Sequence, residues 1–190
     1  MDRTTKRAYA KLNLTLGVLY KRADGYHALD SIMQTIDLFD TVTVERARDI
    51  LVTSTGMLLP YDNTIRRAAE LYRALTGRSA HIRVIKRIPA EAGLGGGSAD
   101  AAATLNALQE LFGEVDEKTL VELAAKVGAD VPFCLKGGTQ RAEGIGEVLT
   151  PVRGMKLNLV VAKPAEGVST KKLFSLLKLP RIMPETTAAL

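Results

Sequence analysis

The feature that most constrains this chain is a glycine-rich stretch that runs directly into an alanine-rich one. Residues 88–105 read IPAEAGLGGGSADAAATL, with four glycines between Gly93 and Gly97. Glycine is unfavourable inside a helix, whereas alanine is the strongest helix former. The stretch therefore predicts a loop with unusual backbone angles, followed at once by the start of a helix.

A helix that begins in this way is suited to binding phosphate. Its first backbone amides have no intrahelical partner, and the helix dipole places partial positive charge at the same end. Glycine removes the Cβ atoms that would hold a phosphate away from those amides. The alternative is a flexible turn between a strand and a helix, for which one or two glycines would normally suffice. We expect phosphate binding by Gly93, Leu94, Gly95, Gly96, Gly97 and Ser98, whose hydroxyl could also cap the helix or contact Mg²⁺.

Two widespread phosphate-binding motifs do not fit the loop. A Walker A motif has a lysine before its Ser or Thr, but Gly97 precedes Ser98 here. The dinucleotide-binding motif begins correctly at Gly93 and Gly95 but meets Ser98 where its last glycine belongs, and no early βαβ unit surrounds it. The loop therefore belongs to another class.

Apolar patterning elsewhere predicts a mixture of strands and helices. Strands are expected at 11–18, around 32–38, at 41–45, at 82–85 and, from a continuous apolar run, at 157–162. Helices are expected after Asn63, at the glycine loop and after Asp116, ending at Gly77, Gly113 and Gly128, and a short one from Ser169 or Thr170 through Leu177. Because two strands precede the first helix, the pattern favours an α+β fold over a doubly wound sheet.

The first predicted strand carries two polar residues of interest. Alternation along 11–18 predicts that Leu12, Leu14, Leu16 and Val18 face the core. Lys11 and Asn13 would then point together toward solvent or a ligand.

Composition limits the classes of function. The 190 residues can bury one large core, and their net charge of +5 is scattered rather than gathered into a nucleic-acid-binding arm, so an anionic ligand is the milder inference. A lone cysteine, Cys134, excludes an internal disulfide, and no Cys and His cluster has metal-ligand spacing, so we expect no protein metal site. Without a signal peptide or an apolar run of about 20 residues, we expect a cytoplasmic protein that binds neither nucleic acid nor membrane.

Four stretches together resemble the GHMP family of small-molecule kinases. They are residues 10–38, 62–69, the glycine loop with its leading Lys86, and 128–147, which reads GADVPFCLKGGTQRAEGIGE. The resemblance implies a GHMP-kinase N-terminal domain of the ribosomal protein S5 domain 2-like fold at 1–162, with 163–190 beginning a truncated C-terminal region. It also implies ATP and Mg²⁺ as cofactors. The likeness is greatest to family members that phosphorylate the 2-hydroxyl of a cytidine-diphosphate-linked methylerythritol in isoprenoid precursor synthesis.

The resemblance also assigns roles to Asp130 and Lys11. Asp130 would be the catalytic base, since its apolar neighbours would raise the basicity of a carboxylate, and Lys11 would be its cationic partner. On the residues by themselves, Asp130 fits equally well as a helix N-cap, and the periodicity favours Lys11 as a solvated strand residue.

Other positions match the family's substrate and nucleotide sites. Asn13, Tyr26 and His27 correspond to the substrate site, where a ring and an imidazole suit a cytosine. Asn63 corresponds to a position near the adenine, and Lys86 could meet the phosphates. Helix capping and strand flanking are the alternatives for Asn63 and Lys86, and His27 beside a turn could be a plain surface residue. Asp100 is left out, since a carboxylate facing the loop would repel phosphate.

The resemblance stops short of the family's full pattern. Family members carry a third glycine- and serine-rich motif, and nothing after Thr150 resembles it. Either the chain is shortened, or a second polypeptide, in a homodimer or as a separate half, completes the cleft. The alternatives to the kinase named above are another GHMP small-molecule kinase, which Tyr26 and His27 argue against, and a catalytically silent nucleotide-binding fragment.

Overall fold

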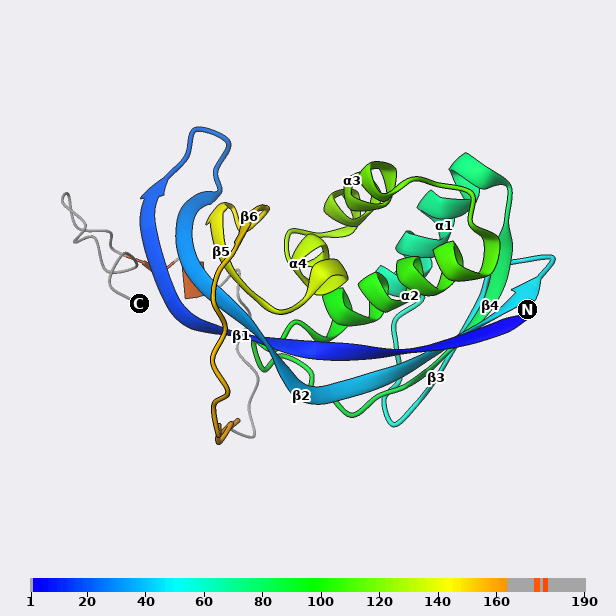
Figure 1. Cartoon of the computed structure of the whole chain (residues 1–190), viewed down its shortest axis with the longest axis horizontal. Helices are drawn as coiled ribbons and strands as arrows, with labels where there is room; N and C mark the ends of the chain where they lie inside the picture. Colours follow the sequence, from blue (N-terminus) through cyan, green and yellow to red (C-terminus); the bar gives the residue numbers. More distant parts are fainter. Residues whose placement is uncertain (1, 164–172, 175, 178–190) are drawn as a thin grey trace.

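A computed structural model describes residues 2–163, 173–174 and 176–177. In this part of the chain, four helices cover one face of a mixed six-stranded sheet (Figure 1). The strands are β1 (Arg3–Lys21), β2 (His27–Ala47), β3 (Leu51–Thr55), β4 (Ser79–Ile85), β5 (Thr139–Gly144) and β6 (Val148–Pro151). The helices are α1 (Thr64–Thr76), α2 (Gly96–Phe112), α3 (Glu117–Val127) and α4 (Val131–Lys136). The expected α+β class is confirmed.

The long strand β2 organises the sheet. Its residues 41–47 pair with β4 and its residues 29–34 pair with β5, while β1 pairs along the opposite edge of β2. β3 extends the sheet beyond β4 as its parallel neighbour, and β6 extends it beyond β5. The main apolar core fills the space between the sheet and the helices, with α2 at its centre.

The expected strands at 32–38 and 41–45 are one continuous strand. Asp40 interrupts the apolar pattern between them, which is why the sequence predicts a break. In the structure the Asp40 side chain is fully buried and bonded to the start of the glycine loop, so the strand continues through it.

The predicted faces of the first strand are wrong in part. Register shifts in β1, one of them between Tyr9 and Lys11, place Ala10 and Lys11 consecutively on buried surface. Lys11 is 8% exposed, whereas Leu16 is 51% exposed. Strict alternation assumes a regular ladder, and an irregularity in the ladder changes which face the following residues occupy.

The predicted helix ends are confirmed with one correction. Asn63 caps α1 and Asp116 caps α3 through their side chains, and Gly77, Gly113 and Gly128 follow the last turns. Ser98 does not cap α2, because the helix already begins at Gly96 and Gly95 occupies the N-cap position.

The buried strand expected at 157–162 is wrong. Residues 157–162 form no strand and are exposed, with Val160 at 98%. An apolar run predicts a buried strand when a second layer covers it, and no layer does so in the part of the chain that the structure describes. Ser169, Thr170 and most of 163–190 lie outside the described residues. No described helix combines the length and apolarity needed to cross a membrane.

Candidate functional site

At Gly95 and Gly96 the glycine loop packs too tightly for side chains. Gly95 has the left-handed φ of +67°, and a Cβ at this position would lie 2.9 Å from Cγ of Lys11. A Cβ on Gly96 would lie 3.0 Å from Cγ2 of Ile88. Glycine is therefore required by backbone conformation at the first position and by contact at both. No side chain caps the helix that follows, so the α2 amides remain available to an anion.

Lys11 joins the loop to the predicted base. Its main-chain amide donates to the Leu94 carbonyl at 3.0 Å, and its aliphatic stem lies against Gly95. Its ammonium lies 3.2 Å from Oδ2 of Asp130 and donates to Oδ1 of Asn13 at 2.7 Å. The structure thus brings together Lys11, Asn13 and Asp130, which lie far apart in the sequence, beside the loop.

Asp130 occupies the N-cap position of α4, which begins at Val131, yet its carboxylate does not cap that helix. The carboxylate is one third exposed and faces the Lys11 ammonium, and Oδ1 lies 4.0 Å from where a Cβ on Gly146 would stand. An N-cap aspartate would accept an amide hydrogen bond from the next turn. The helix-capping alternative is therefore not what the side chain does.

Sequence reasoning missed Ser31, which orients Asn13. The Asn13 amide donates to Oγ of Ser31 at 2.8 Å, and that hydroxyl donates to the Thr15 carbonyl at 2.5 Å. Ser31 is 1% exposed and lies on β2, opposite Leu16 of β1. A serine within an apolar strand was a visible signal, but its partner depends on the strand register.

Cys134 lies beneath this cluster as a packed thiol. Burial raises its pKa to about 12, and the nearby charge of Asp130 adds to the increase. The thiol therefore stays protonated, as its apolar sequence neighbours predict.

Lys86 lies under the loop, but its ammonium faces two carboxylates. It bonds to Oδ2 of Asp40 and lies 2.5 Å from Oδ2 of Asp100. Burial by itself would lower the pKa of Lys86, but the charges and hydrogen bonds of the two carboxylates outweigh it, so the pKa is raised. Burial raises the pKa of Asp100 to about 7, against the opposing effect of Lys86. That Lys86 meets nucleotide phosphates stays a prediction.

Asn63 lies beside a hollow at the start of α1. Its Oδ1 accepts from the Arg66 amide at 3.0 Å and its amide donates to the Pro60 carbonyl at 2.8 Å, so it caps the helix. The hollow has a volume of about 430 Å³ and is lined by Val52, Thr53, Ser54, Leu58, Leu59, Pro60, Tyr61, Asn63 and Arg66. The adjacent Thr64 hydroxyl donates to the Gly97 carbonyl at 2.6 Å, which joins this region to the glycine loop.

Tyr26 and His27 lie at the far end of the β1–β2 hairpin, after the predicted turn at Asp24 and Gly25. Tyr26 is 60% exposed. The His27 ring lies 5.2 Å from the ring of Phe174, a residue that sequence reasoning did not single out. About ten residues of strand, or roughly 30 Å of chain, separate this end from Lys11. The structure therefore gives these residues an aromatic neighbour but does not bring them into the Lys11 cluster.

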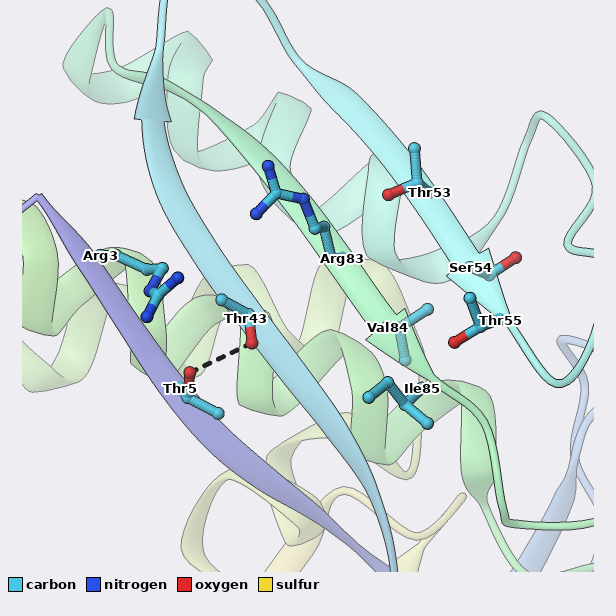
Figure 2. A pocket seen from close by; sticks show the side chains of 9 residues that line it. All are labelled: Arg3, Thr5, Thr43, Thr53, Ser54, Thr55, Arg83, Val84 and Ile85. Atoms are coloured by element: carbon cyan, nitrogen blue, oxygen red, sulfur yellow. Dashed lines mark hydrogen bonds between the residues drawn. The ribbon is translucent and has the colours of Figure 1, made fainter.

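A second hollow, of about 420 Å³, lies on the sheet face opposite the helices (Figure 2). Its lining includes Arg3, Arg83 and several hydroxyl side chains, two of which, Thr5 and Thr43, lie 3.1 Å apart. It contains none of the predicted site residues. We place the candidate site at the glycine loop, where a charged pair and a restricted backbone meet.

Comparisons with known proteins identify the family. A family model described as the GHMP kinases N terminal domain matches residues 63–138. The 4-diphosphocytidyl-2-C-methyl-D-erythritol kinase of Caldicellulosiruptor saccharolyticus is 45% identical over 192 residues, covering 96% of this chain and 66% of the relative. The protein of the same name from Clostridium botulinum strain Loch Maree is 43% identical over 190 residues, covering 95% of this chain and 68% of the relative.

A solved structure gives the same result. The crystal structure of 4-(cytidine 5'-diphospho)-2C-methyl-D-erythritol kinase matches with a TM-score of 0.67 and 44% identity, over 78% of this chain and 55% of that one. The chain spans about two thirds of the length of the Caldicellulosiruptor and Clostridium relatives. Sequence identity above 40%, the matched N-terminal domain and the shared fold lead to one conclusion: the chain belongs to the GHMP kinase family.

Proposed function

We propose that this chain carries the phosphate loop and catalytic base of an ATP-dependent kinase that phosphorylates the 2-hydroxyl of 4-diphosphocytidyl-2-C-methyl-D-erythritol. The observation that carries the proposal is the position of Lys11, whose stem packs on Gly95 while its ammonium pairs with Asp130 at 3.2 Å. A phosphate held on the loop amides would thus lie near both a cation and a carboxylate. The names of the relatives support the choice of substrate.

The loop fits a nucleotide phosphate. Side chains are excluded at Gly95 and Gly96, and the uncapped end of the 17-residue helix α2 offers amides and partial positive charge. Ser98 provides a hydroxyl in the first turn of that helix. Among the described residues, no group of three His, Cys, Asp or Glu side chains is placed to hold a metal. The Ser98 hydroxyl would help to hold Mg²⁺, which would supply charge neutralisation at the phosphates.

Asp130 and Lys11 supply the remaining chemistry. The Asp130 carboxylate would take the proton of the acceptor hydroxyl as that oxygen attacks the terminal phosphorus. The Lys11 ammonium, 3.2 Å from the Asp130 carboxylate, would stabilise negative charge on the transferred group. Asn13, oriented by Ser31, fixes the Lys11 ammonium by accepting one of its hydrogen bonds.

The adenine of ATP and the cytosine of the acceptor substrate each have a candidate site. The hollow beside Asn63 would take the adenine, since it is lined by Leu58, Leu59 and Tyr61 and borders the loop through Thr64. Tyr26, His27 and Phe174 would take the cytosine, because aromatic rings stack on a base and an imidazole can donate or accept a hydrogen bond.

The experiment measures ADP release by the purified chain with and without the cytidine diphosphate substrate. We expect substrate-dependent release that falls by about 10² to 10⁴ fold in Asp130→Asn, while the affinity for nucleotide changes less than threefold. The matched control is Asp116→Asn, an exposed aspartate at another helix start, which should leave turnover unchanged. Release in wild type that Asp130→Asn leaves unaltered contradicts the role of Asp130.

The two rival functions give different results in the same assay. Nucleotide binding without turnover indicates the catalytically silent fragment. Turnover with a different alcohol, such as homoserine or mevalonate, and none with the cytidine substrate indicates another GHMP kinase.

Other predictions from the sequence remain as they were. The division at residue 162, completion of the cleft by a homodimer or a second polypeptide, and the cytoplasmic location without nucleic-acid or membrane partners all stay predictions.

A further inference from the structure

Three charged side chains lie in the core directly beneath the glycine loop. Asp40 of β2, Lys86 after β4 and Asp100 of α2 are 0%, 5% and 2% exposed at their side chains. Burying a charge costs several kcal/mol unless partners compensate for it. A single ammonium faces two buried carboxylates, so one carboxylate has no cation of its own, and this arrangement needs a reason beyond filling the core.

Asp40 bonds to the segment that enters the loop. Its Oδ1 accepts from the main-chain amides of Arg87 and Ile88, the latter at 2.8 Å, and its Oδ2 accepts from the Lys86 ammonium. One carboxylate therefore binds three successive residues. The segment continues through Pro89 to the glycines, so Asp40 fixes the direction in which the chain enters the loop.

Lys86 carries the connection to the segment that leaves the loop. Its Nζ lies 2.5 Å from Oδ2 of Asp100, in the second turn of α2. A Cβ on Gly96 would stand 3.6 Å from the same Nζ and 3.0 Å from the Ile88 side chain. The first residue of the helix thus rests on two residues that Asp40 holds in place.

Asp100 explains why the ammonium must stay where it is. Its Oδ1 is buried and has no hydrogen-bond partner in the described structure. An unneutralised carboxylate beneath the α2 amides would repel a phosphate bound above them. The Lys86 ammonium offsets this charge, and Asp40 keeps the ammonium in place.

We propose that Asp40 is a positioning residue for the phosphate loop, acting through Lys86 and the Arg87 and Ile88 amides to join the two ends of the loop. Asp40 touches no reacting group. The proposal rests on the nucleotide binding proposed above and adds to it the residue that sets the shape of the loop.

The test compares three variants of the full chain. Asp40→Asn breaks the link to Lys86 but leaves Lys86 and Asp100 as a neutral pair. Asp100→Asn removes the second carboxylate and keeps every Asp40 contact. Asp37→Asn, an exposed position on the same strand, is the matched control. Affinity is measured by fluorescence titration with N-methylanthraniloyl-ADP. Loop opening is measured by hydrogen exchange at the amides of Lys11 and Ala99, which donate to the loop carbonyls of Leu94 and Gly95.

We expect Asp40→Asn to raise the dissociation constant at least tenfold and to speed exchange at the amides of Lys11 and Ala99 at least tenfold. Asp100→Asn should bind as tightly as wild type or more tightly, and Asp37→Asn should change neither quantity. Where turnover is measurable, Asp40→Asn should raise the KM for nucleotide and leave kcat within threefold, whereas a general folding defect would lower kcat.

The outcomes separate the two proposals. If wild type binds no nucleotide, the proposed function is overturned, and the exchange rates still decide whether Asp40 shapes the loop. If wild type binds and Asp40→Asn matches it in affinity and exchange, the positioning role is overturned and the proposed function stands. Equal losses in Asp40→Asn and Asp100→Asn would assign the three charges to stability and also overturn the positioning role.

Discussion

At Gly95, one hydrogen in place of a methyl group lets a lysine reach the loop. The Lys11 stem occupies the space where a Cβ would stand, and the same residue has a backbone conformation that side chains disfavour. Lys11 is therefore held by contact as well as by charge. The burial of its ammonium is offset by Asp130 and Asn13, both within hydrogen-bonding or ion-pair distance.

Alanine substitutions at two loop glycines separate the effect of backbone strain from the effect of contact with Lys11. Gly93 also has a positive φ, of +71°, but a Cβ there would meet nothing within 4 Å. We expect Gly93→Ala to cost about 1 kcal/mol from backbone strain and to change nucleotide affinity less than threefold. Gly95→Ala should cost more and weaken N-methylanthraniloyl-ADP binding at least tenfold, because Lys11 must move. Urea unfolding and fluorescence titration measure both, and equal binding by the two variants would contradict the contact argument.

Among the elements, the starts of the helices divide into two kinds. α1 and α3 begin with Asn63 and Asp116, whose side chains bond to amides of the first turn. α2 begins at Gly96, and Gly95 at its N-cap position has no side chain to make such a bond. In a capped helix, a first-turn amide donates its hydrogen bond to the cap side chain. In an uncapped helix, the first-turn amides can donate hydrogen bonds to a ligand. The contrast explains why α2, rather than α1, is suited to receive a phosphate.

The caps give a matched pair of predictions. Asn63→Ala and Asp116→Ala should each lower the free energy of unfolding by about 1 kcal/mol, measured by urea denaturation. If the hollow beside Asn63 takes the adenine, Asn63→Ala should also weaken nucleotide binding, while Asp116→Ala should not. Equal affinities in the two variants would assign Asn63 to capping only.

On the scale of the whole molecule, a single sheet face supports the site. The residues that meet at Lys11 come from β1 and from the start of α4, and those beneath the loop come from β2, β4 and α2 (Figure 1). The pairing of β2 with β1, β4 and β5 brings these elements together. Loss of packing between the sheet and α2 should therefore affect stability far more than changes in the exposed segment after β6.

Substitutions at two valines test this difference between the packed core and the exposed segment after β6. Val84 of β4 is 1% exposed, and Val160 is 98% exposed. Val84→Ala should lower the free energy of unfolding by about 2 kcal/mol, since it removes two buried methyl-sized groups and leaves a cavity. Val160→Ala should change it by less than about 0.5 kcal/mol. A large loss at Val160, seen as a lower urea midpoint, would indicate that residues 157–162 are covered in solution.

The sequence by itself determined the features that depend on neighbours along the chain. Helix caps at Asn63 and Asp116, the glycines that end helices and the strain of the glycine loop follow from local backbone chemistry, so they could be predicted. The family motifs added candidate roles for Asp130 and Lys11, because residues at matching spacings suggest matching chemistry.

The tertiary structure decided what depends on strand register and on contacts between distant segments. The irregular ladder of β1 moved Lys11 onto buried surface, and the pairing of β2 gave Asn13 its partner Ser31. In the sequence, Asp40 predicts a break between two strands. In the structure, the Lys86 ammonium and the amides of Arg87 and Ile88 satisfy its buried carboxylate, and the strand continues. A local pattern records whether a residue is polar or apolar, but the partner that makes a buried charge tolerable comes from elsewhere in the chain, and only the fold brings the two together.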